Sequence, residues 1–311
     1  MRLTECKNNN VDGSVFVSVI VPVYRQLDEL ALCLQALRDQ TLGAEHFEVL
    51  VVDNEKTSLL AASIVIPDNC RIVHEPKPGS YAARNAGIEN ATGSVLAFTD
   101  ADCIPNRSWL ENGLDAMRNN PSALIVGRID LFPKSEHKPT AAELWDIRQG
   151  FPQRLYAETK GFGATANVMT ERSTLEHAGN FDASLKSGGD YEWGRRVSSQ
   201  GHPAVYADDV LVRHPARASF KEIVQKISRV VRGARQLERQ QVYEQGRFVA
   251  ELRRQLVPPI GYWFRVMQDR GLCFSHRIKL CVMFTGIRYY TVYVRVRVLA
   301  EEKFGRIAEF R

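Results

Sequence analysis

The pattern of apolar and polar positions divides the first hundred residues into alternating segments. Short runs of apolar and β-branched residues predict buried strands. They lie at 16–22, 47–53, 71–74 and 95–99. Pro22 is expected to end the first strand, because proline cannot donate a ladder hydrogen bond. Helices are predicted between the strands by leucines at helical spacing, namely Leu27, Leu30, Leu34 and Leu37, and from Tyr81 to Asn90. Strands alternating with helices indicate a doubly wound α/β domain with a mostly parallel sheet.

The alternation becomes weaker after residue 126. Residues 131–140 form a Pro- and Lys-rich loop, which predicts a boundary or a mobile flap. Aromatic residues interleaved with basic ones from Trp145 to Phe162 suit either a sugar-binding surface or core packing. A strand ending near Thr170, a helix at 191–200 with Asp190 as its N-cap, and a short strand at 210–214 complete this region.

From Phe220 onward the chain is predicted to be helical and basic, with a break at Val257-Pro258-Pro259. Apolar residues at 278–299 follow a spacing that favours an amphipathic helix. Residues 291–298 also alternate strictly, so a strand is the alternative there. We therefore expect a disordered tail at 1–14, a catalytic α/β domain at 15–216, and a helical, basic, amphipathic extension at 217–311.

Charge is distributed unevenly along the chain. Residues 217–311 hold 20 Lys and Arg against 8 Asp and Glu, a net charge of +12, whereas residues 1–216 carry −7. A basic extension on an acidic body predicts an anionic partner, and a solvated basic surface is the alternative. Six scattered cysteines without metal-binding spacing indicate a reducing, cytosolic environment. Neither a signal peptide at 1–14 nor a membrane-spanning helix is expected.

Two carboxylates follow the strand predicted at 95–99. Asp100 and Asp102 are two residues apart, so in an extended chain their side chains project from one side, roughly 7 Å apart. Paired carboxylates at the carboxyl end of a strand suit Mg²⁺ or Mn²⁺ acting on a nucleotide, and an acidic turn is the alternative. Gly79-Ser80 begins a helix whose free N–H groups favour an anion, and Arg84 lies one turn further on.

Taken in order, several segments resemble the family 2 glycosyltransferases, which have the GT-A fold. The resemblance rests on VSVIVPVY (17–24), VVDN (51–54), KPGSYAARNAG (77–87), FTDADC (98–103), TANVMTERSTLEHAGNFD (165–182) and GGDYEWGRR (188–196). It spans about two thirds of the chain and implies a nucleotide-binding half at about 15–130 and an acceptor half at about 131–216.

The resemblance implies a donor site in the first half. Pro22, Val23 and Tyr24 would surround the base of a nucleotide-sugar, and Asp53 would contact that base. Arg84 would face the nucleotide or its phosphates. A UDP-sugar is the favoured donor, and the acceptor would be a polysaccharide glycan or a lipid-linked one.

The resemblance also implies the groups that perform the transfer. Asp102 would ligate Mn²⁺ or Mg²⁺, with Asp100 near the ribose and the metal, and His214 close to the metal or the diphosphate. Asp190 would be the general base that takes the acceptor proton in a single, inverting displacement. Its place at a helix start is expected to favour the ionised form.

Departures from the family pattern leave alternatives open. Asn54 and Gly189 stand where acidic residues are common, and Glu192 is the candidate substitute for the missing carboxylate beside Asp190. An inactive binding or scaffold protein is therefore one alternative. A nucleotidyltransferase is less favoured, because residues 22–26 contain no glycine-rich phosphate loop. No QxxRW motif follows Asp190, which favours transfer of single sugars over polymer synthesis.

The extension adds a prediction about location. In a helix, Arg277, Arg288 and Arg295 would share one stripe beside a broad apolar face. Such a helix is typical of the interface of an anionic membrane, which would make the protein peripheral on the cytoplasmic, inner face of the membrane. Packing against the catalytic domain or a second copy, as in a homodimer, is the alternative. No nucleic-acid partner is expected, because no RNA- or DNA-binding motif is present.

Overall fold

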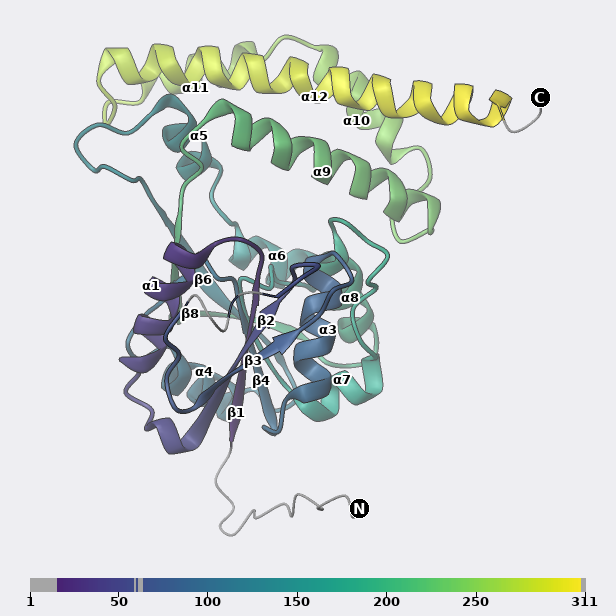
Figure 1. The fold of residues 1–311 in the computed structure, drawn as a ribbon. Coiled ribbons are helices and arrows are strands. Elements are labelled where there is room, and N and C mark those ends of the chain that lie inside the picture. The colour runs from purple at the N-terminus through teal and green to yellow at the C-terminus, as the bar shows by residue number, and fades with distance from the viewer. Residues whose placement is uncertain (1–15, 59, 61–63, 309–311) are drawn as a thin grey trace.

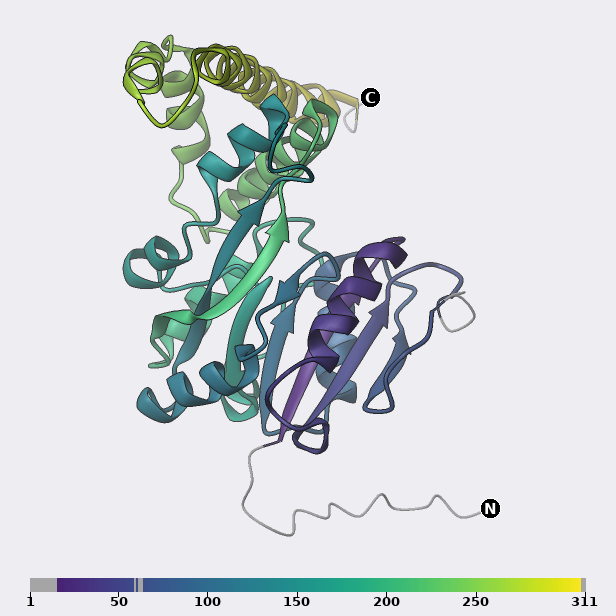
Figure 2. The ribbon, with the colours of Figure 1, turned by 90° about the vertical axis from the view of Figure 1, so that its left-hand side faces the viewer.

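A computed structural model of the chain describes residues 16–58, 60 and 64–308 (Figure 1). The tail predicted at 1–14 lies outside these residues. One sheet of eight strands organises the fold, in the order β3-β2-β1-β4-β7-β6-β8-β5. Helices cover both of its faces, and a layer of further helices lies at one end (Figures 1 and 2).

The first four strands in this order are parallel, as predicted. They are β3 (Cys70–His74), β2 (Phe47–Asp53), β1 (Val17–Val23) and β4 (Val95–Thr99). Pro22 does not end β1, because it stays in register with Val52 of β2. Its nitrogen is directed toward β4, where pairing already stops at Ile20 and Phe98, so no ladder hydrogen bond is lost.

The other half of the sheet is mixed, which corrects the expectation of a mostly parallel sheet. β7 (Asn167–Glu171) is antiparallel to both β4 and β6 (Leu124–Phe132). β8 (Ala204–Pro215) runs parallel to β6, and β5 (Ile104–Pro105) pairs antiparallel with β8. β8 is much longer than the strand predicted at 210–214, and β6 extends into the segment predicted as loop.

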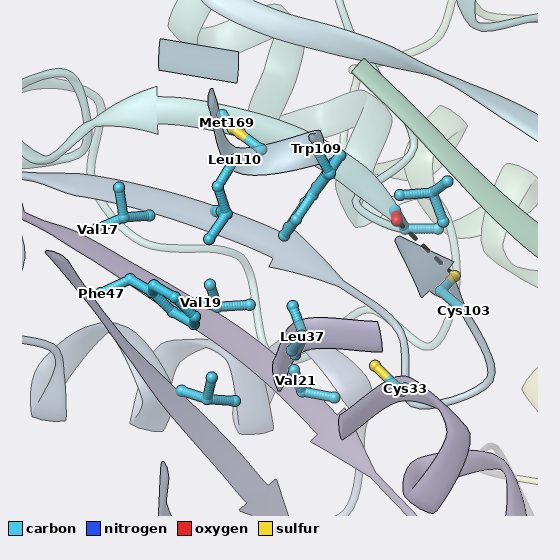
Figure 3. Packing of buried hydrophobic residues seen from close by; sticks show 14 of the residues in the cluster. Val17, Val19, Val21, Cys33, Leu37, Phe47, Cys103, Trp109, Leu110 and Met169 are labelled. Atoms are coloured by element: carbon cyan, nitrogen blue, oxygen red, sulfur yellow. Dashed lines mark hydrogen bonds between the residues drawn. The ribbon is translucent and has the colours of Figure 1, made fainter. Parts of the chain in front are cut away.

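Two helical layers enclose the sheet. α1 (Leu27–Arg38) and α4 (Trp109–Asn119) cover one face, near the short η1 (Ala44–His46). α3 (Ser80–Asn90), α6 (Gln153–Lys160), α7 (Arg172–Ala178) and α8 (Gly189–Ser199) belong to the other. Side chains along β1 alternate between these layers: Val19 and Val21 pack under α1, and Ile20 packs under α3. Figure 3 shows the first layer, with Trp109 above the strands.

The C-terminal extension is helical, as predicted. It consists of α9 (Phe220–Arg239), α10 (Arg247–Leu256), α11 (Ile260–Gln268) and α12 (Phe274–Ala308). α5 (Ala141–Gln149) joins this layer, because Trp145 packs in one cluster with Ile223, Leu280 and Ile287. Residues 291–298 lie in α12, so the strand alternative is wrong. The break between α10 and α11 falls at the predicted prolines.

The three arginines predicted to face a membrane point inward instead. Arg277 donates to the carbonyls of residues 267 and 272, and Arg288 donates to those of residues 254, 255 and 257. Arg295 is buried and bonds Glu251 and the carbonyl of Phe248. The last carbonyls of a helix lack partners within that helix, so α12 supplies partners where α10 and α11 end. No helix within the described ranges has both the length and the apolar character needed to cross a membrane.

Candidate active site

A cavity of about 480 Å³ lies at the edge where β1 and β4 end, between the two halves of the sheet. Parallel strands bring their carboxyl ends to this edge, so the loops after them meet here. Helix α9 of the extension also lines it. Seven of the predicted site residues line this cavity together, as follows: Pro22, Val23, Tyr24, Arg84, Asp100, Asp102 and Asp190. His214 lines it as well.

Arg84 links the carboxylates of this cavity. Its side chain is buried and pairs with Asp100. Its charge also lowers the pKa of Asp190, so it acts on carboxylates from both halves of the sheet. Its Nε has no hydrogen-bond partner among the described residues.

Asp102 and His214 are the side chains that best fit a divalent cation. The Nε2 atom of His214 lies 3.5 Å from the Asp102 carboxylate. His214 Nδ1 is 2.7 Å from the carbonyl of Pro215, which can only accept, so the neutral ring carries its proton there and Nε2 is free to ligate. Burial raises the pKa of Asp102, and the positive charge of Arg217 opposes this shift. Carboxylate and imidazole atoms converging in this way suit Mn²⁺ or Mg²⁺.

Cys103 also lies within this group but does not fit a ligand role. Its ligand atom and those of Asp102 and His214 all lie within 4.8 Å of one another. However, the thiol is fully buried and donates to the carbonyl of Ala166 (Figure 3). Burial raises its pKa well above the ordinary value, so it stays protonated, whereas a metal binds the thiolate.

Asp190 lies in the first turn of α8 and lines the same cavity. The helix begins at Gly189, and Gly188 is the N-cap with φ of 87°, so Asp190 is not the predicted cap. Its carboxylate accepts from Thr165 Oγ1 at 2.9 Å. Burial raises its pKa, despite the opposing charge of Arg84 and the bond from Thr165. The expectation that the helix start would keep this carboxyl more acidic is therefore wrong, because burial outweighs it.

Gly189 is explained by Tyr81 rather than by Glu192. The Tyr81 hydroxyl accepts from the N–H of Gly189 at 2.9 Å and lies 3.4 Å from the nitrogen of Asp190. Glu192, the predicted substitute, instead pairs with Arg196 one turn along α8 at 2.8 Å. A tyrosine from α3 thus occupies the place where a side chain at 189 would lie.

Asp53 lies outside the cavity lining, although its neighbour Asn54 lines it. The Asp53 carboxylate is buried and accepts from Ser58 Oγ at 2.5 Å and from the N–H of Glu55 at 3.1 Å. Asn54 bonds the N–H of Gly79 and the carbonyls of residues 75 and 77, so it fixes the loop before α3. The contact of Asp53 with a base remains a prediction.

Aromatic rings line the part of the cavity beside Asp190. Tyr156 stacks on Phe162, which meets Tyr191 edge to face, and Tyr191 meets Tyr243 at 4.8 Å between ring centroids. Trp145 packs among the C-terminal helices, as the core-packing alternative predicts, while Tyr156 and Phe162 of the same segment line the cavity. Their faces suit the apolar side of a sugar ring. Sugar binding by this segment remains a prediction.

Several of these residues were not predicted from the sequence. Tyr81, Thr165 and Tyr243 carry no motif of their own, and their roles depend on neighbours distant in sequence. The positions of Tyr81 in the motif at 77–87 and of Thr165 at the start of the motif at 165–182 were the available signals.

Comparison with known proteins agrees with this fold. The model of the glycosyl transferase family 2 matches residues 18–179. The chain therefore belongs to the family 2 glycosyltransferases and is a glycosyltransferase enzyme. Its mixed sheet with flanking helices is that of the GT-A glycosyltransferases. The match ends before Asp190.

Individual relatives support the same family. Glycosyltransferase AglE of Haloferax volcanii is 36% identical over 224 residues, which cover 70% of this chain and 72% of AglE. The pre-mycofactocin glycosyltransferase of Mycobacterium tuberculosis is 26% identical over 66% of this chain, which spans only 44% of that relative. The mannosyltransferase PcManGT of Pyrobaculum calidifontis, solved with GDP-Man and Mn²⁺, has a TM-score of 0.51 at 18% identity, covering 92% of this chain and 74% of that one. This last similarity concerns the fold.

Proposed function

We propose that this protein is a metal-dependent, inverting glycosyltransferase that moves one sugar from a nucleotide-sugar to a hydroxyl of a polysaccharide or lipid-linked glycan. One observation carries the proposal. A single cavity holds the Asp102 and His214 pair, the Arg84 and Asp100 pair and the Asp190 carboxylate. A single displacement needs one set of groups for the leaving diphosphate and another for the acceptor proton.

In the proposed reaction the acceptor oxygen attacks the anomeric carbon and forms the new C–O bond. The bond between that carbon and the diphosphate oxygen breaks, and its electron pair leaves with the diphosphate. The proton of the acceptor hydroxyl passes to Asp190, whose carboxylate is oriented by Thr165 and by the backbone bond to Tyr81. A single displacement inverts the anomeric carbon, whereas retention through two displacements needs a covalent intermediate on a nucleophile.

Asp102 and His214 would hold the cation. When bound, Mn²⁺ or Mg²⁺ supplies Lewis-acid neutralisation of the charge on the departing diphosphate. Arg84 neutralises Asp100. It also opposes the burial that raises the pKa of Asp190, which keeps a larger share of this carboxyl ionised.

The alternative of an inactive binding or scaffold protein was based on Gly189 and Asn54. Both now have structural explanations, because Tyr81 occupies the space beside Gly189 and Asn54 fixes the loop before α3. Neither substitution removes a group that the proposed reaction uses.

We also propose an anionic membrane surface as partner of α11 and α12. Apolar side chains on the outer face of α12 recur three, four or seven residues apart and therefore share one stripe. They are Phe274, Ile278, Val282, Tyr289, Tyr293 and Val296. Residues 257–300 contain seven Lys and Arg, of which Arg265, Arg270, Lys279 and Arg297 are exposed. The only acidic residue in this range, Asp269, pairs with Arg148. An apolar helix face flanked by basic residues is typical of helices that lie in the interface of an anionic membrane.

The proposed function is tested by giving the full chain a panel of UDP-, GDP-, CDP- and dTDP-sugars with Mn²⁺. A UDP-sugar remains the predicted donor, and GDP-mannose is included because PcManGT was solved with it. We expect one donor to raise the melting temperature, since ligand binding stabilises the folded state by mass action. The same donor should release its nucleoside diphosphate in a reaction that EDTA stops. No stabilisation by any member of the panel would refute the proposal.

A further inference from the structure

Three cations from the C-terminal extension converge on the metal side of the cavity. Arg217 follows β8, and Lys226 and Arg229 lie one turn apart on α9. All three line the 480 Å³ cavity and a second cavity of about 890 Å³, and both cavities also include Asp102 and His214. The three cations therefore surround the place where the two cavities meet.

The group carries more positive than negative charge. Asp146 of α5 is buried and pairs with Arg217 at 2.9 Å and with Lys226 at 3.5 Å. Arg229 is exposed and has no ion pair among the residues that the structure describes. Asp146 is the one described carboxylate that forms an ion pair with these cations, while Glu29, Asp102 and Glu222 also line the second cavity. Burial together with Arg217 lowers the pKa of Lys226 to about 8. Concentrated, partly desolvated positive charge favours binding of an anion.

The scaffold holds Arg217 and Lys226 in place before any ligand binds. Asp146 accepts from both the backbone N–H and the guanidinium of Arg217. The ammonium of Lys226 lies 5.2 Å from the centre of the Phe151 ring, which is itself 5.4 Å from the His214 ring. Because the cations are fixed next to the proposed metal ligands, a bound anion would contact both.

We infer that Arg217, Lys226 and Arg229 bind the diphosphate of the nucleotide donor, so that the extension completes the donor site. This inference rests on the proposed function. All three cations line the second cavity together with Asp102 and His214, whereas Asp190 does not line it. The cluster therefore lies on the side where the diphosphate leaves and away from the base. As the anomeric C–O bond breaks, the electron pair stays on the diphosphate oxygen, and fixed cations stabilise that charge.

The experiment compares nucleoside diphosphates with the corresponding monophosphates. Full-length protein is titrated by calorimetry with UDP, GDP, CDP and dTDP in Mn²⁺, and then with the monophosphate of the base that binds. The variants are Arg229→Ala, which removes an exposed side chain without an ion pair, and Lys226→Gln, which leaves Asp146 paired with Arg217. Lys221→Ala is the matched control, because Lys221 is an exposed cation on α9 that lines neither cavity.

We expect both variants to bind the diphosphate about tenfold more weakly or worse, since bonds to charged groups are worth that much. The monophosphate affinity should change less than twofold, and Lys221→Ala should resemble the wild type. Unchanged diphosphate affinity in both variants would overturn this inference but not the proposed function. An equal loss of affinity for the diphosphate and the monophosphate would do the same. Should Lys226→Gln unfold, Arg229→Ala decides by itself. A wild type that binds no nucleoside diphosphate would overturn the proposed function as well.

Discussion

The hydroxyl of Tyr81 accepts a hydrogen bond from the backbone of Gly189, and the Tyr81 ring fills the space beside that glycine. A Cβ added at 189 would lie 2.7 Å from two ring carbons, closer than such atoms approach in proteins. The same hydroxyl lies 3.4 Å from the nitrogen of Asp190. Helix α3 thereby positions the start of α8, which carries the proposed base, Asp190.

This contact predicts that Gly189→Ala lowers both stability and turnover. The added methyl forces the ring or the helix start to move, and overpacking of this kind costs about 1–3 kcal/mol in unfolding free energy. Gly261→Ala is the control, because a Cβ there meets only the end of the Arg265 side chain at 3.8 Å. Urea denaturation should separate the two variants. If Gly189→Ala is as stable as the wild type, Tyr81 does not confine this position.

The role of Asp190 predicts that Asp190→Asn loses turnover by about 10²-fold or more, the usual effect of removing a general base. Binding of the nucleoside diphosphate should change little, because the diphosphate lies at Asp102. Glu192→Gln is the control on the same helix, since Glu192 pairs with Arg196. NMR of the product gives a second test, in which retention of the anomeric configuration would contradict the mechanism.

The raised pKa of Asp190 predicts an acid limit on turnover. A base must be unprotonated, so kcat/KM should fall as the pH drops through a pKa above the ordinary 3.8. Burial raises this pKa, and Arg84, Thr165, Asp100, Tyr81 and Tyr156 are the other groups electrostatically coupled to it. Thr165→Val removes a bond to the ionised form and should move the limit upward by up to about one pH unit. A limit that stays in place would remove Thr165 from this role.

The metal site predicts different outcomes for three neighbours. Asp102→Asn and His214→Ala should abolish the Mn²⁺ dependence of nucleoside diphosphate binding, because each removes a predicted ligand atom. Cys103→Ala should retain it, since the buried thiol is protonated and bonded to the Ala166 carbonyl. Calorimetry with and without EDTA measures all three. Loss of Mn²⁺ dependence in Cys103→Ala would show that the thiol ligates the metal.

The fold of the first half was predictable because its signals are local. A buried strand such as β2 appears as an apolar run, and the carboxylates after β4 follow directly from their position at its end. The effect of Pro22 was misjudged because proline disrupts a strand only where its missing N–H would have bonded a neighbouring strand. On that side of β1 the pairing with β4 has already ended, which the sequence of β1 does not reveal. Asp190 was misjudged because burial depends on the whole cavity.

The extension shows what sequence periodicity leaves undetermined. Arg277, Arg288 and Arg295 do share a stripe, as their spacing predicts, but spacing does not specify what the stripe faces. Only the placement of α10 and α11 shows that the carbonyls at their C-terminal ends lie next to this arginine stripe. The approach of Lys226 to the cavity is likewise a contact between distant segments, for which the sequence of α9 carries no signal.

The outer face of α12 yields the final prediction, which uses point variants because α12 packs on α9 and α10 through Val294 and Val298. Full-length protein should float with phosphatidylcholine–phosphatidylglycerol vesicles and dissociate in high salt, which screens the attraction of roughly 1 kcal/mol per basic residue. Ile278→Glu combined with Val282→Glu should abolish flotation without loss of stability, because these side chains are 44% and 67% exposed. Val65→Glu is the control, because Val65 is 94% exposed and far from α12 in the sequence. If the double variant floats like the wild type, the face does not bind membrane. If it instead converts a homodimer to a monomer in analytical ultracentrifugation, a second copy covers this face.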